Sequence, residues 1–163
     1  MTYDLRQATE EDINSLAAFY STISKKDEGY FAQLFEKDCV VLIAKQKSKM
    51  LAFGVLNFEP KYSVYQRLEI PEIQDLNVHP EYRQQGIATA MIEAFEQMTR
   101  DQGIEMIGIS VGLTKEYGPA QRLYFKLGYI SDGNGVTYDR EFVAHGQSKP
   151  VDDDLCLMMV KSL

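Results

Sequence analysis

The most informative stretch of the chain is Asp75-Leu76-Asn77-Val78-His79-Pro80-Glu81-Tyr82-Arg83-Gln84-Gln85-Gly86-Ile87-Ala88-Thr89. Its apolar alternation predicts a strand that ends at the proline, because proline has no N–H for a sheet ladder. A loop with Arg83 and Gly86 follows, and then a helix begins. The start of a helix exposes unpaired N–H groups and the positive end of its dipole, which together bind anions. The stretch therefore predicts a binding site for a diphosphate, without a metal.

Particular residues of this loop suit that role. Gly86 can adopt a positive φ and lets an oxygen approach the backbone closely. Ala88 keeps the first helical turn unobstructed, and Arg83 adds a fixed charge and fork-shaped donors. An isolated Arg-x-x-Gly-x-Ala is short, however, and the glycine could simply begin a helix. The chain has neither the Gly-x-Gly-x-x-Gly of dinucleotide-binding folds nor a Gly-Lys-Ser/Thr after the glycine, so neither of those phosphate sites is predicted.

A second stretch, Ala120-Gln121-Arg122-Leu123-Tyr124-Phe125-Lys126-Leu127-Gly128-Tyr129, follows the predicted fifth strand. The two stretches together resemble the GNAT (Gcn5-related) N-acetyltransferase family. That family carries Arg/Gln-x-x-Gly-x-Gly/Ala after its fourth strand, then a small residue, Leu-Tyr and Gly-Tyr/Phe on a later short helix. Both signatures are present here in the same order and separation.

The order of expected elements supports the same fold. Strands are predicted at about 2–8, 39–45, 51–59, 69–78, 106–113, 136–143 and 155–160, and helices at about 9–23, 29–37, 86–102 and 119–127. Such an order describes an α/β layer fold with a mixed sheet. The resemblance implies the GNAT acyl-CoA N-acyltransferase fold, with a central mixed sheet of about seven strands flanked by about four helices. It also implies one domain over residues 1–163 and acetyl-CoA as co-substrate.

The resemblance assigns roles to individual positions. Backbone groups of Leu76 and Val78 would pair with the pantetheine arm, and backbone amides near the glycine would hold the pyrophosphate. Tyr124 corresponds to a tyrosine that faces the cofactor sulfur. The family often has Asn where this chain has Tyr117, which puts the usual side-chain hydrogen bond there in doubt. The cofactor-binding residues implied are Leu76, Val78, Arg83, Gln84, Gln85, Gly86, Ile87, Ala88, Thr89 and Tyr117.

Acetyl transfer to an amine also needs groups that move protons. Tyr124 is the candidate donor to the leaving thiolate, although it could only be packing. The N–H of Val78 is the candidate donor to the carbonyl oxygen. Glu72 is the candidate base, because strand alternation places it, Gln74, Leu76 and Val78 on one side and the family's glutamate base occupies this position. A solvent-facing Glu72 is the alternative, with Glu69, Asp75 or a chain of waters as base.

Composition limits the partners. The chain has 163 residues, with 17 Lys and Arg against 24 Asp and Glu, a net charge of −7. That charge disfavours a nucleic-acid partner, because binding phosphates requires a positive surface. It suits a cationic amine slightly better than an anion, although an acidic surface can also serve solubility alone. The Asp152–Asp154 run could attract a cation or be a solvated turn. Cys39 and Cys156 lack the spacing of a metal site.

The N-terminus lacks the layout of a signal peptide, and the apolar runs are far shorter than the ~20 residues of a membrane helix. A cytoplasmic protein with no membrane partner is therefore expected. The predicted function is transfer of the acetyl group of acetyl-CoA directly to a primary amine of a small molecule, in a ternary complex. The alternatives are a non-catalytic acyl-CoA-binding module, a longer acyl donor, and a protein or peptide N-acetyltransferase. A homodimer is possible from the resemblance.

Overall fold

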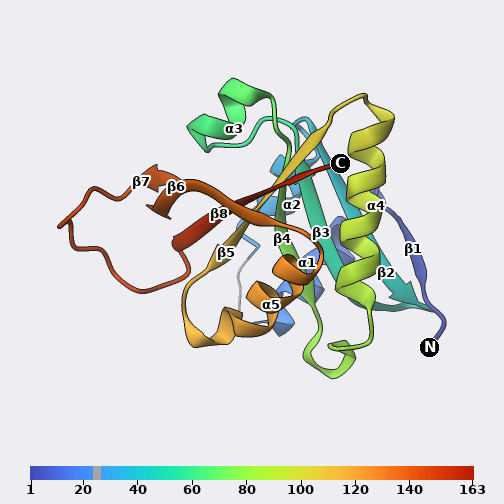
Figure 1. Ribbon diagram of the computed structural model, residues 1–163. Helices are drawn as coiled ribbons and strands as arrows, with labels where there is room; N and C mark the ends of the chain where they lie inside the picture. The colour runs from blue at the N-terminus through green and yellow to red at the C-terminus, as the bar shows by residue number, and fades with distance from the viewer. Residues whose placement is uncertain (24–26) are drawn as a thin grey trace. The chain divides into compact units, whose positions relative to one another are not determined.

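The computed structural model describes residues 1–23 and 27–163. They form eight strands, one more than expected, and five α-helices with three short 3-10 helices. Figure 1 shows these elements along the chain. The chain divides into two compact units, the first made of Met1–Phe58 and Ile73–Phe95 and the second of Glu59–Glu72 and Glu96–Leu163. The prediction of one domain over the whole chain stays a prediction.

The first unit holds four neighbouring strands, β1 (Asp4–Gln7), β2 (Cys39–Gln46), β3 (Lys49–Asn57) and most of β4 (Glu72–Val78). β1 pairs antiparallel with β2, and β2 pairs antiparallel with β3. The hairpin between β2 and β3 turns at Lys47, which has a φ of 55°. The end of β4 is joined to β3 because the N–H of His79 donates to the carbonyl oxygen of Leu51 at 2.8 Å.

Two helices cover this unit's core. A 3-10 turn η1 (Glu10–Asp12) leads into α1 (Ile13–Thr22), and the backbone N–H of Thr9 donates to Oδ2 of Asp12 at 3.0 Å in a capping box. The short helix α2 (Tyr30–Leu34) follows. Both helices bury apolar side chains against β2 and β3, in a cluster that includes Leu16, Phe19, Tyr20, Phe31, Leu34, Ile43, Phe53 and Val55.

The long helix α4 (Ile87–Asp101) follows the 3-10 turn η2 (Pro80–Tyr82) and a loop. Its fully buried positions Ile87, Met91, Ile92 and Phe95 recur at helical spacing, as the sequence predicts. The helix ends at Asp101 and is followed by Gly103, whose φ of 74° is that of a left-handed cap. The start of α4 positions the candidate site, because the first backbone amides of the helix directly follow the loop at Gly86.

The second unit contains β5 (Met106–Gly112), β8 (Leu155–Ser162), β6 (Ile130–Tyr138) and β7 (Glu141–Phe142), in that spatial order. All three neighbouring pairs are antiparallel. The 3-10 turn η3 (Lys115–Tyr117) and α5 (Gly118–Lys126) connect β5 to β6. The single strand expected at 136–143 is wrong: β6 begins earlier, and a turn with φ of 49° at Asp139 and 64° at Arg140 separates it from β7.

The helix α3 (Ser63–Leu68) was not predicted, and it ends directly before the expected start of the fourth strand. Glu69 lies in the left-handed region with φ of 54° and ends this helix, so β4 begins only at Glu72. Tyr65 of α3 is fully buried, and its hydroxyl donates to the carbonyl oxygen of Met159 at 2.5 Å. A Cβ on Gly108 would lie 2.4 Å from the Tyr65 ring, so glycine in β5 makes room for it.

Candidate active site

The loop before α4 has the geometry of an anion cradle. Gly86 has a φ of 82°, as its predicted role requires, and Gln84 also lies in the left-handed region at 59°. A Cβ on Gly86 would meet no atom within 4 Å, so the space over this backbone is open. The first helical bond runs from the N–H of Ala90 to the carbonyl oxygen of Gly86 at 3.0 Å. The amides of Ile87, Ala88 and Thr89 therefore precede the helical ladder, where an oxyanion can accept from them.

Arg83 holds this loop against the end of β4. Its Nε donates to the carbonyl oxygen of Val78 at 3.1 Å, and the side chain is exposed. The preceding turn is tightened by proline at the start of η2 and by the His79 ring, which accepts from the N–H of Glu81. The guanidinium is thus a fixed positive charge beside the loop, where the sequence places a phosphate partner.

Strand β4 is not regular. Asp75, in its middle, has a φ of 48°. Side chains alternate between the two faces of a strand only while its residues stay extended. The predicted placement of Glu72, Gln74, Leu76 and Val78 on one side is therefore wrong, because the left-handed residue interrupts the alternation between the first two and the last two.

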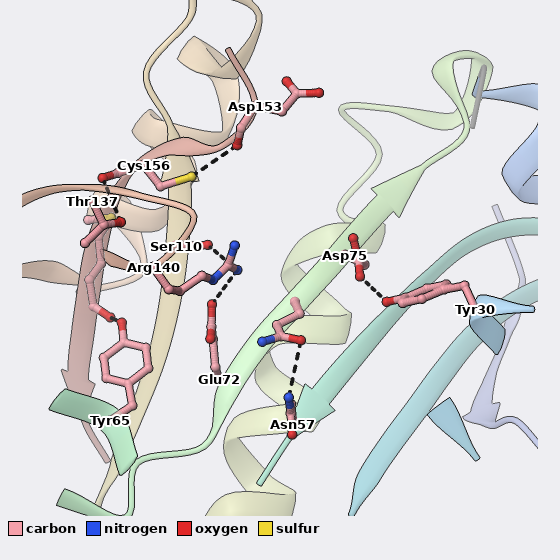
Figure 2. A network of polar contacts seen from close by, with 12 residues as sticks. Tyr30, Asn57, Tyr65, Glu72, Asp75, Ser110, Thr137, Arg140, Asp153 and Cys156 are labelled. Carbon is pink, nitrogen blue, oxygen red and sulfur yellow. Dashed lines mark hydrogen bonds and ion pairs between the residues drawn. The ribbon is translucent and has the colours of Figure 1, made fainter. Parts of the chain in front are cut away.

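Asp75 makes a contact that the sequence did not indicate. The hydroxyl of Tyr30, the first residue of α2, donates to Oδ2 of Asp75, as Figure 2 shows. Both side chains are half-buried. The ring of Tyr30 stacks on that of Tyr20, with centroids 5.7 Å apart and planes 17° from parallel. Burial, followed by the charge of Asp75, raises the pKa of Tyr20 to about 12.

Glu72, the predicted base, is fully buried and lies in an ion pair. Nη2 of Arg140 is 2.8 Å from Oε1 of Glu72 and 3.2 Å from Oγ of Ser110 (Figure 2). The alternative of a solvent-facing Glu72 is therefore wrong. The neighbouring turn residue, Asp139, forms a second ion pair with Lys61 at 2.7 Å. Two ion pairs thus join the β6–β7 turn to the 59–72 segment of its own unit. The turn supplies the acidic partner of one pair and the basic partner of the other.

Tyr124 is on α5 and is 7% exposed. Burial raises its pKa to about 12, so its hydroxyl is protonated at neutral pH and can donate. Tyr117 lies at the start of the same helix, with its hydroxyl 2.8 Å from Oδ1 of Asp153. A Cβ on Gly112 would lie 2.4 Å from the Tyr117 ring, so this tyrosine packs directly on the backbone of β5.

The predicted site residues fall into two groups. The first unit brings together Leu76, Val78, Arg83, Gln84, Gln85, Gly86, Ile87, Ala88 and Thr89, and the second unit contains Glu72, Tyr117 and Tyr124. Sequence reasoning missed Tyr30 and Arg140 as partners of the two β4 carboxylates. Neither residue lies in a motif, and no local pattern could have identified them.

A strand, an open glycine turn and a long helix in this order have the features of proteins that bind a diphosphate-bearing ligand at the start of a helix. The acetyltransferase (GNAT) family model matches residues 4–129, and the chain belongs to this family. The resemblance inferred from the two motifs is thereby confirmed. As a member it is an acetyl-CoA-dependent N-acetyltransferase, and acetyl-CoA is its co-substrate.

Relatives place the chain among enzymes with different acceptors. It is 26% identical over 133 residues to aminoalkylphosphonate N-acetyltransferase of Salmonella typhimurium, which covers 77% of this chain and 84% of that protein. The ribosomal-protein-S18-alanine N-acetyltransferase of Escherichia coli superposes with a TM-score of 0.73 at 15% identity, covering 99% of this chain and 94% of that one. A GNAT acetyltransferase of Elizabethkingia anophelis with acetyl-CoA bound gives 0.65 at 14% identity, covering 99% and 98%.

These similarities confirm the predicted class of fold, a mixed α and β fold of the GNAT type. No helix in residues 1–23 and 27–163 has the length and apolar character needed to cross a bilayer.

Proposed function

We propose that the protein transfers the acetyl group of acetyl-CoA directly to the primary amine of a small molecule, with both substrates bound at once. The observation that carries the proposal is the open left-handed turn at Gly86, with a fixed cation beside it and a long helix after it. This arrangement fits the diphosphate of coenzyme A and needs no metal. Holding both reactants in line can supply several kcal/mol, so no covalent enzyme intermediate is required.

In this proposal the first unit binds the coenzyme. Backbone amides of 85–89 donate to the pyrophosphate, and Arg83 neutralises part of its charge. Leu76 and Val78 bind the pantetheine arm through their backbone groups, as an added strand would. The N–H of Val78 donates to the acetyl oxygen as negative charge develops there.

Tyr124 is the proposed acid that protonates the leaving thiolate. Its buried hydroxyl keeps its proton at neutral pH, which an acid needs before the transfer. Tyr117 is the proposed contact to the coenzyme at the position where the family often has Asn. Because its hydroxyl bonds to Asp153, this contact is made by the ring.

Glu72 is the proposed base, provided that its ion pair with Arg140, which the sequence did not indicate, opens. Its carboxylate is paired with the guanidinium of Arg140 at 2.8 Å, so this ion pair has to open before Glu72 can reach the amine. Arg140 is only partly buried, with 22% of its side chain exposed, so it can leave this pair when substrate arrives. The alternative route for the proton is a chain of waters.

The net charge and the names of two relatives bear on the choice of acceptor. The Salmonella relative is named for an aminoalkyl substrate, and the net charge of −7 favours a cationic acceptor over an anionic one. The Escherichia structure is named for a ribosomal-protein alanine, which keeps a peptide N-terminus as the second candidate.

The deciding experiment measures thiol release from acetyl-CoA with matched acceptors. The panel contains short alkylamines, aminoalkylphosphonates, polyamines, aminoglycosides and peptides that begin with alanine. We expect kcat/KM to be highest for a small amine. Turnover confined to the peptides would refute the small-molecule acceptor, and tight coenzyme A binding without turnover on any amine would indicate a binding module.

A further inference from the structure

Asp75 carries the next inference, which rests on the proposed function. It is a strand residue with a φ of 48°, where extended backbone is the norm. Left-handed backbone is strained for a non-glycine residue, although Asp and Asn tolerate it better than others. Strained positions of this kind cluster at functional sites, where the surrounding structure holds them in place. The left-handed backbone of Asp75, in the strand proposed to bind the pantetheine arm, therefore suggests that this residue has a role in binding or catalysis.

The carboxylate of Asp75 is held in one orientation. Tyr30 donates to Oδ2, and burial raises the pKa of Tyr30 above its ordinary range, so this donor stays protonated throughout the pH range of an assay. Tyr30 is itself fixed by stacking on Tyr20. The start of α2 is in turn set by Asp27, whose two oxygens accept from the N–H groups of Gly29 and Phe31 at 3.2 Å. A neutral donor orients the carboxylate without cancelling its charge.

Asp75 also lies in the right part of the molecule. It directly precedes Leu76, the proposed partner of the pantetheine arm, and belongs to the same compact unit as the Gly86 loop. The other carboxylate of β4, Glu72, is already neutralised by Arg140 and is fully buried. Half-buried Asp75 presents a carboxylate next to the half-buried aromatic side chain of Tyr30, and a carboxylate beside an aromatic ring is the chemistry that attracts an alkylammonium.

We propose that Asp75, positioned by Tyr30, binds the ammonium group of the acceptor through Oδ1 and so selects primary alkylamines. The half-buried ring of Tyr30 supplies the apolar surface on which the first carbons of the acceptor lie. Tyr30 is a positioning residue, and Asp75 is the specificity-determining one. The proposal is independent of which group finally takes the proton.

The test uses Asp75→Asn, because asparagine also adopts left-handed backbone and still accepts from Tyr30. The best alkylamine of the panel is compared with its alcohol analogue, which is neutral and is measured as a competitive inhibitor. We expect KM for the amine to rise about 10–100-fold, the loss of one charge-assisted hydrogen bond, while Ki for the alcohol and Kd for acetyl-CoA change less than about twofold. Tyr30→Phe should raise the amine KM less, by about 3–10-fold, because it removes orientation and keeps the charge.

Asp139→Asn is the matched control, with the same change at a φ of 49° but at an exposed turn. It should leave the amine KM within about twofold of the wild-type value. An active wild-type enzyme whose amine KM is unchanged in Asp75→Asn, or whose amine KM and alcohol Ki rise equally, overturns this inference alone. A wild-type enzyme that neither binds acetyl-CoA nor releases thiol overturns the proposed function instead. If Asp75→Asn does not fold, Tyr30→Phe decides by the same amine-to-alcohol comparison.

Discussion

Replacing Gly86 with alanine probes the coenzyme loop with a single methyl group. Alanine at a φ of 82° is strained by roughly 1–2 kcal/mol. The added Cβ meets no atom within 4 Å, so no steric clash contributes and backbone strain is the whole perturbation. The loop can relieve that strain only by rotating its backbone, which turns the amides of 85–87 away from the bound diphosphate.

The expected loss of affinity follows from those amides. A hydrogen bond to a charged group contributes about 1.5–3 kcal/mol. Losing one of them raises the Kd for acetyl-CoA about 10–100-fold, since each 1.4 kcal/mol is a factor of about ten. Strain alone lowers Tm by about 2–8 °C in a chain of this size.

Gly103→Ala is the control, because Gly103 has a φ of 74° and equally open surroundings but ends α4. Calorimetric titration with acetyl-CoA and thermal unfolding are measured on both variants. The two should lose similar Tm, and only Gly86→Ala should lose affinity. Equal Kd values for the two variants would refute the assignment of the Gly86 amides to the coenzyme.

The other predictions concern the catalytic groups and the stability of the first unit. Tyr124→Phe should lower kcat about 100-fold with little change in the Kd for acetyl-CoA, measured by single-turnover kinetics, and an unchanged kcat would contradict its role as an acid. Glu72→Gln should lower kcat about 100-fold with little change in the Kd for acetyl-CoA if Glu72 is the base, because glutamine keeps the shape of the side chain and cannot take a proton, whereas an unchanged kcat would argue for another base. Hydrogen bonding to Arg6 lowers the pKa of Asp12 to about 2 from its ordinary 3.8, so this carboxylate stabilises the fold above about pH 4 and the contribution is lost as pH falls toward 2. Tm measured from pH 5 to pH 2 should therefore fall more steeply for the wild type than for Asp12→Asn, and parallel curves would contradict the pairing.

The sequence predicted the parts of the fold that local patterns determine. The helix that follows Gly86 and the positive φ of Gly86 itself each depend on a few neighbouring residues, and both are confirmed. The helix α3 escaped prediction because its six residues make too few turns to show a periodicity. The turn at 139–140 also escaped, since left-handed Asp and Arg lack the glycine or asparagine that usually mark such a turn.

The candidate site divides in the same way. The glycine loop could be recognised because its anion-binding features lie within one short segment. The partner of Glu72 lies 68 residues away along the chain, and that of Asp75 lies 45 residues away. Such pairs are created by tertiary packing, and no periodicity in the sequence reports them. The irregular backbone at Asp75 could not be predicted from the sequence either, because one aspartate within an apolar alternation does not show whether its backbone is extended or left-handed.

The two ion pairs of the β6–β7 turn also favour one orientation of that hairpin over the reverse one. Lys61 meets Asp139 and Glu72 meets Arg140, so the charges of the two partners run in opposite order. Docking the turn the other way round would bring the lysine to the arginine and the glutamate to the aspartate, and like charges at such distances repel. Both ion pairs therefore support the orientation that the β6–β8 register sets, and a double charge swap at 139 and 140 would place like charges opposite each other at both positions.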